Sequence, residues 1–199
     1  MSRTRSCILT LAGLLALQGC GRDQTSATQN EIAAARQGSI QEIMALNVDP
    51  NADQIWGAFK TVETASGSVT SEPKTAAEWK ALEERARRLL DGAATLDRLP
   101  PAVPPGADVA DAHIAGTRTV AQIEADIKAD PAAFRARVAV FRAAAREILE
   151  SAIKRDKAGT LEGSERLDAS CDGCHFAYWH PRVPPTQMPG SEAFEQHRP

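Results

Sequence analysis

Apolar residues recur at steps of three and four over long stretches of the chain, which is the spacing of amphipathic helices. One such stretch predicts a helix from about Thr75 to Arg98, and another runs from Asp130-Pro131 to Gly159. Asp130 is suited to cap the second of these helices, because proline is favoured at the first helical position. The seams comprise Trp79, Leu82, Ala86, Leu89, Ala93 and Leu96, then Phe134, Val138, Phe141, Ala145, Ile148 and Ala152.

A less regular pattern begins near Ser39. Its apolar positions are Ile40, Ile43, Met44, Val48, Ile55, Trp56, Phe59 and Val62. Pro50 interrupts the pattern, because proline lacks a backbone N–H and clashes with the preceding turn. We therefore expect either a kinked helix or two helices that meet there. A loop rich in Gly, Ser and Thr is expected from Ala65 to Pro73.

The segment after the 75–98 helix contains four prolines between Leu99 and Gly106, which stop any helix. An irregular connection follows to about Thr117, with a short helix expected over Val120–Lys128. A fourth helix is expected from near Thr160 to Pro181, and a Pro-rich tail occupies residues 183–199. With 5% aromatic residues and few β-branched runs, the sequence predicts an all-α fold with a long crossover between the second and third long helices.

The N-terminus has the features of an export signal. Ser2–Arg5 is positively charged, and the apolar stretch from Cys7 to Leu17 is too short to span a bilayer, so residues 1–19 are interpreted as a signal peptide. Leu17-Gln18-Gly19-Cys20 resembles a bacterial lipobox, which implies cleavage before Cys20 and lipidation of its thiol. The alternative is plain secretion. Residues 20–38 are polar and suit a flexible tether.

Glycine at residue 21, in place of aspartate, favours an anchor in the outer membrane facing the periplasm, by the rule known for lipoproteins. The formal net charge of -3 argues against a nucleic-acid partner.

Cys171-Asp172-Gly173-Cys174-His175 is the most specific motif in the chain. Two thiols about one helical turn apart can both bond the vinyl groups of a haem, and the adjacent histidine can bind its iron. A zinc site would need a second pair of ligands at short spacing, which the sequence lacks. A thioredoxin-like dithiol belongs at the start of a helix in a βαβ context. We therefore favour covalent c-type haem attachment, with Cys171 and Cys174 as anchors and His175 as the proximal ligand.

Four helices with a long crossover, and a haem motif followed by Tyr178 on the last helix, resemble the cytochrome c′ family. The resemblance covers residues 39–182 and implies an antiparallel four-helix bundle that holds one covalent haem c near its C-terminal helix. Some family members leave the sixth iron position empty and bind small gases. In low-spin members a methionine early in the first helix fills that position, and Met44 stands there in this chain.

The resemblance implies a low-spin His/Met one-electron carrier of the periplasm, without enzymatic activity, whose partners are redox proteins. The alternative is a five-coordinate protein that binds nitric oxide or carbon monoxide, in which Met44 is core packing. A haem-free dithiol protein is a third reading. Several gas-binding members carry arginine or lysine four residues after the ligating histidine, where this chain has Trp179. This difference disfavours the gas-binding alternative.

The remaining candidate ligands are weaker. His180 follows His175 by five residues, about 140° around a regular helix, so it is expected at the surface of a helix end. His113 falls in the irregular crossover, while Met188 and His197 fall in the tail. The sequence is also compatible with a homodimer of this chain.

Overall fold

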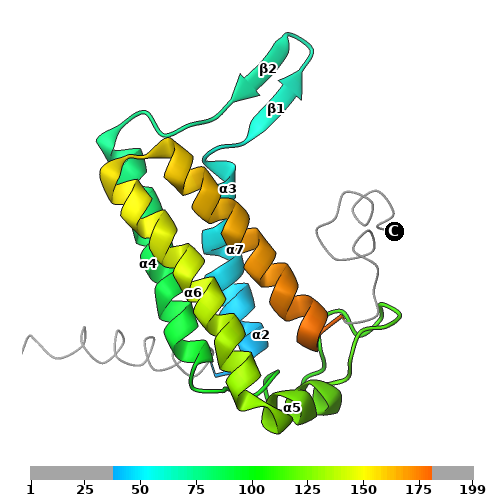
Figure 1. Ribbon diagram of the computed structural model, residues 1–199. Coiled ribbons are helices and arrows are strands. Elements are labelled where there is room, and N and C mark those ends of the chain that lie inside the picture. The colour runs from blue at the N-terminus through cyan, green and yellow to red at the C-terminus, as the bar shows by residue number, and fades with distance from the viewer. Residues whose placement is uncertain (1–37, 181–199) are drawn as a thin grey trace, which may run out of the picture. The chain divides into compact units, whose positions relative to one another are not determined.

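The computed structural model describes residues 38–180 (Figure 1). The predicted signal peptide, the lipidation site Cys20, the tether up to residue 37 and the tail with Met188 and His197 lie outside the described residues. The predictions for these segments therefore stay predictions.

The described part is mostly helical, as the sequence predicts, with one small antiparallel sheet in addition. Its elements are α2 (Ile40–Ile43), the π-helix η1 (Met44–Val48), α3 (Asp49–Gly57), β1 (Thr61–Thr64), β2 (Gly67–Thr70), α4 (Ala76–Leu96), α5 (Val120–Ala129), α6 (Pro131–Lys154) and α7 (Lys157–Tyr178).

The first three elements follow each other without a gap and form one helical stretch. Its α-helical hydrogen-bond pattern is replaced by the wider π-helical pattern just before Pro50. In the π-helix the Asp49 N–H donates to the Met44 carbonyl, five residues earlier. Two features of the sequence favour this wide turn. Val48 follows Ile43 by five residues, so one extra residue must be absorbed to keep both in the core. A wider turn also relieves the clash of the Pro50 ring with the preceding carbonyls.

Residues 61–70 form a hairpin, so the helical position of Val62 is wrong. The loop expected at 65–73 is wrong for residues 67–70, which form a strand, and confirmed for the turn at residues 65 and 66 and for residues 71–73. Thr61 pairs with Thr70 and Val62 with Val69, and Gly67 adopts a φ of 118° at the turn. The side chains of Val62 and Val69 are 44% and 58% exposed. The β-branched residues around a turn favour strands, and this preference overrides the apparent helical spacing of Val62.

The helix ends follow local capping chemistry. Thr75 and Glu78 form a capping box at the start of α4, and the Asp130 carboxylate accepts from the Ala133 N–H at 2.8 Å at the start of α6. The expectation that Gly159 ends the third helix is wrong. Arg155 ends α6 in the left-handed region with a φ of 56°, and Asp156 caps α7.

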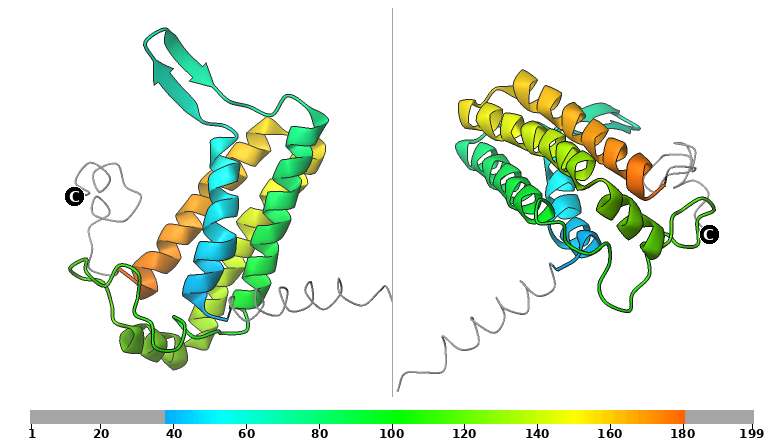
Figure 2. Two further views of the ribbon diagram at one scale, coloured as in Figure 1. Left: turned by 180° about the vertical axis from the view of Figure 1, so that it is seen from behind. Right: turned by 60° about the horizontal axis from the view of Figure 1, so that its bottom comes forward.

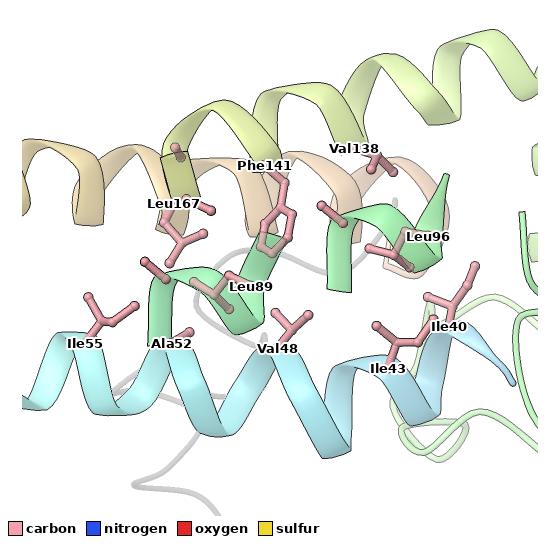
Figure 3. Close-up of a cluster of buried hydrophobic side chains, with 14 of the residues drawn as sticks. Ile40, Ile43, Val48, Ala52, Ile55, Leu89, Leu96, Val138, Phe141 and Leu167 are labelled. Carbon is pink, nitrogen blue, oxygen red and sulfur yellow. The ribbon is translucent and has the colours of Figure 1, made fainter. Parts of the chain in front are cut away.

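The long helices pack side by side in a fixed order. The first helical stretch lies against α4, α4 against α6, and α6 against α7 (Figures 1 and 2). All twelve residues of the two predicted seams are buried, which confirms both seams. Figure 3 shows how Leu89 and Leu96 of α4, Val138 and Phe141 of α6, and Leu167 of α7 meet the apolar residues of the first stretch.

Gly163 lies at a close approach of α7 to α6, and it provides a test of this packing. A Cβ at Gly163 would lie 2.8 Å from Ile148 Cγ1 and 3.1 Å from the Ile148 backbone nitrogen. We expect Gly163→Ala to lower the free energy of unfolding by about 1–3 kcal/mol, measured by urea denaturation. Gly57→Ala is the control, because no atom lies within 4 Å of its added Cβ. An unchanged midpoint for Gly163→Ala would contradict the described packing.

Candidate functional site

The core-facing seam of α7 differs from the seams of α4 and α6. Its members follow each other at steps of four and three, and they are Thr160, Ser164, Leu167, Cys171, Cys174 and Tyr178. The first three and Tyr178 are buried, whereas Cys171 and Cys174 are only half-buried at the edge of the core. The seam is therefore less completely buried at the two cysteines, and it is buried again at Tyr178, one turn later. The structure places both thiols on one side of one helix, as the motif predicts.

The surroundings of the two thiols keep them protonated. Burial raises the pKa of Cys171 to about 12, and the nearby carboxylates of Asp168 and Asp49 act in the same direction. Burial also raises the pKa of Cys174 to about 11, although Arg137 opposes the shift. Both cysteines lie in the C-terminal half of α7, where the helix dipole does not favour a thiolate. They are thus neutral, weakly nucleophilic thiols at neutral pH.

His175 follows the thiols on the last turns of α7 and is half-buried. Burial lowers the pKa of its imidazole, and the carboxylates of Asp172 and Asp111 oppose this shift. Within residues 38–180 its ring nitrogens make no hydrogen bond. A neutral imidazole has a nitrogen lone pair that can coordinate a metal, and this is the form of histidine that binds iron.

Two neighbours from α6 hold this part of α7. Arg137 Nη1 donates to the Gly173 carbonyl at 2.6 Å, between the two cysteines of the motif. The Phe134 ring packs edge-on against Tyr178, with ring centroids 5.4 Å apart. The helix turn that carries the motif is therefore fixed from the α6 side, although sequence periodicity gives no signal for Arg137.

Met44 lies on a different element, at the start of the π-helix. Its side chain is half-buried and packs against the edge of the core. Asp49, one wide turn further along, is the residue of this stretch whose charge acts on the Cys171 thiol. Asp49 is thus close enough to Cys171 for its charge to act on that thiol.

His180 is buried, at 4% exposure, so its expected place at the surface is wrong. The last turn of α7 is wide, because the His180 backbone N–H donates to the His175 carbonyl five residues earlier. A regular helix would rotate His180 by about 140°, whereas this turn brings its ring to 6.4 Å from the His175 ring. Sequence spacing alone could not reveal this turn.

The other candidate residues of the sequence analysis lie in three different parts of the fold. His113 is exposed in the crossover, and Trp79 is buried in the α4 seam. Trp179 is half-buried at the end of α7, where its carbonyl accepts from the Arg118 N–H at 2.9 Å.

Other kinds of site receive little support from the described residues. Among residues 38–180, no group of three or more His, Cys, Asp or Glu side chains could hold a bare metal ion. Nor is any helix in this range long and apolar enough to cross a membrane. A groove of about 660 Å³ lies near the hairpin, lined by Asp53, Gly57, Glu72, Lys74 and Arg85 among others, away from the motif.

Comparisons with protein-family models, with curated proteins and with solved structures find no match to this chain. The functional assignment therefore depends on the residues and the geometry of the site.

The protonated thiols provide a test of the site. In folded protein with both thiols free, we expect iodoacetamide to alkylate Cys171 and Cys174 at least about tenfold more slowly than in the urea-unfolded chain, because the thiolate is the reacting form. The rate should keep rising with pH towards about 11 and 12, instead of levelling off near the ordinary value of 9.0. Mass spectrometry of timed samples measures both rates. Equal rates in folded and unfolded protein would contradict the described burial.

Proposed function

We propose that this protein is a c-type cytochrome in which Cys171 and Cys174 hold one covalent haem and His175 is the proximal ligand of its iron. The observation that carries the proposal is the local opening of the α7 seam at two thiols one turn apart, with a neutral histidine beside them. A planar apolar group bonded to both thiols would complete the core at this point. The donor set also fits, since thioether formation consumes two thiols and the iron takes a neutral imidazole.

The electrostatics argue against the dithiol alternative. Reactive cysteine pairs have lowered pKa values and usually lie at helix N-termini. In this protein both pKa values are raised, to about 12 and about 11, and the pair lies towards the C-terminal end of α7. Thiols of this kind are poor catalysts of disulfide exchange but remain available for enzyme-assisted attachment to haem.

We further propose that the fold is an antiparallel four-helix bundle of the cytochrome c′ kind. In this reading the stretch from α2 to α3 is the first helix, followed by α4, α6 and α7. The neighbour order of the helices supports the proposal, as does the long crossover from residue 97 to residue 119. Figure 2 shows the first stretch and α7 running in opposite directions.

Met44 is the proposed distal ligand. Asp49 acts on Cys171, and the two helical stretches are antiparallel. Met44 precedes Asp49 by five residues and His175 follows Cys171 by four, so in antiparallel helices both are displaced from Asp49 and Cys171 in the same direction, by about one turn. A half-buried thioether at that level is suited to complete the iron coordination.

A haem held in this way supplies one-electron transfer between ferric and ferrous iron. The chain's own residues anchor it through Cys171 and Cys174, orient it through His175 and shield it from water through the apolar seams. A thioether ligand and an apolar core both favour the ferrous state. We therefore propose an electron carrier, and an enzymatic role is not part of the proposal. Lipid anchoring through Cys20 and a periplasmic location with redox-protein partners belong to the same proposal.

Replacement of Met44 tests the distal ligand. In haem-loaded protein, we expect Met44→Ala to convert the ferric iron from low spin to high spin, to remove the weak far-red sulfur-to-iron band and to open the iron to carbon monoxide. Optical spectra before and after reduction measure all three changes.

Leu46→Ala is the matched control, because Leu46 lies in the same π-helix but is 52% exposed. Its spectrum should equal that of the wild type. If Met44→Ala only lowers the free energy of unfolding, by about 2–5 kcal/mol, and leaves the spectrum unchanged, then Met44 is core packing. In that case a wild-type iron that binds carbon monoxide would support the five-coordinate alternative.

A further inference from the structure

The wide last turn of α7 puts a second histidine against the proposed proximal ligand. The His175 and His180 rings meet edge to face, with their centroids 6.4 Å apart and their planes at 86°. This distance and angle are typical of contacting aromatic rings. The backbone fixes the arrangement, because the N–H groups of both Trp179 and His180 donate to the His175 carbonyl at 2.8 Å.

The crossover before α5 holds His180 in place. Nδ1 of His180 lies 3.1 Å from Thr117 Oγ1, and Nε2 lies 3.9 Å from Asp111 Oδ2. The neighbouring Arg118 N–H donates to the Trp179 carbonyl, which ties the same segment to the end of α7. His180 is therefore buried and hydrogen-bonded at Nδ1, with the Asp111 carboxylate near Nε2.

We propose that His180 is a positioning residue for His175. Its ring limits rotation of the His175 imidazole about the Cβ–Cγ bond, and residues 111–118 hold that ring through Thr117 and Asp111. The inference rests on the proposed function only in that His175 binds the iron, and it does not depend on Met44. Neighbours that orient a metal-binding histidine tune the metal as well as the ligand.

The orientation of an axial imidazole can be read directly from the iron. The plane of the ring sets the splitting of the iron orbitals, which determines the g values of the ferric protein in electron paramagnetic resonance. A single fixed ring plane gives one narrow set of g values, whereas a ring with several orientations gives shifted or broadened signals. A residue that acts only on fold stability would not move these values.

The experiment uses the haem-loaded full chain in the ferric state with cyanide added, because cyanide fills the sixth position and keeps the iron low-spin whether or not Met44 binds it. It compares His180→Ala with His180→Phe. We expect His180→Ala to shift or broaden the g values, because the facing ring is lost. His180→Phe keeps a ring of similar size, so it should restore a single narrow signal close to that of the wild type. His113→Ala is the matched control, since His113 is an exposed histidine of the same crossover.

The outcomes separate the two proposals. Wild-type protein without covalent haem overturns both the proposed function and this inference. A wild-type haem signal that is unchanged in His180→Ala overturns the inference alone. If His180→Ala does not fold, His180→Leu takes its place, because it fills the same space without a ring. Unchanged g values in His180→Leu then overturn the inference.

Discussion

The close packing of α7 against α6 fixes the rotation of the helix that carries the candidate site. Gly163 lets the two backbones approach, because a Cβ there would meet the backbone of Ile148. On the same side of α7, Arg166 pairs with Glu147, and Arg137 donates to the Gly173 carbonyl. Because that side of α7 contacts α6, the adjacent side, which carries Leu167, Cys171 and Cys174, faces the core. The direction of the two thiols is thus set by contacts made elsewhere on the helix.

The charged groups and the apolar groups around the motif have opposite effects on the redox state of the proposed haem iron. Asp168 and Asp49 act on the Cys171 thiol, and Asp172 and Asp111 act on the His175 imidazole, so four carboxylates border the proposed haem site. Negative charge near the iron favours the ferric state, whereas burial in the core and a thioether ligand favour the ferrous state. In the proposed cytochrome, the potential would therefore depend on a balance that this chain sets with carboxylates from α3, α7 and the crossover.

Much of the fold could be predicted from the sequence because its signals are local. The seams of α4 and α6 follow directly from steps of three and four, and Thr75 and Asp130 mark helix starts through capping chemistry. The π-helix and the hairpin were missed for opposite reasons. The step of five from Ile43 to Val48 is a signal of the π-helix, but Pro50 by itself also predicts an irregularity at this place. Val62 fitted a helical stripe by chance, although its β-branched neighbours favour strands.

The site could be predicted only in part, because its residues lie on several elements. Spacing alone gives Cys171, Cys174 and His175, and all three lie on α7 as expected. The burial of His180 depends on a wide turn and on contacts with Thr117 and Asp111, which are more than sixty residues away in the chain. Contacts of this kind leave no periodic pattern in the sequence. The distal ligand remains a prediction from family resemblance, supported by the placement of Asp49.

In the proposed cytochrome, one covalent haem has its iron bound by His175 and Met44. The most direct measurement is an optical spectrum of the purified protein, first ferric, then ferrous, with carbon monoxide added last. We expect a low-spin spectrum that keeps the far-red sulfur-to-iron band in the ferric state and does not change with carbon monoxide. A high-spin spectrum that shifts at once with the gas would contradict ligation by Met44, and a protein without haem absorption would contradict the whole proposal.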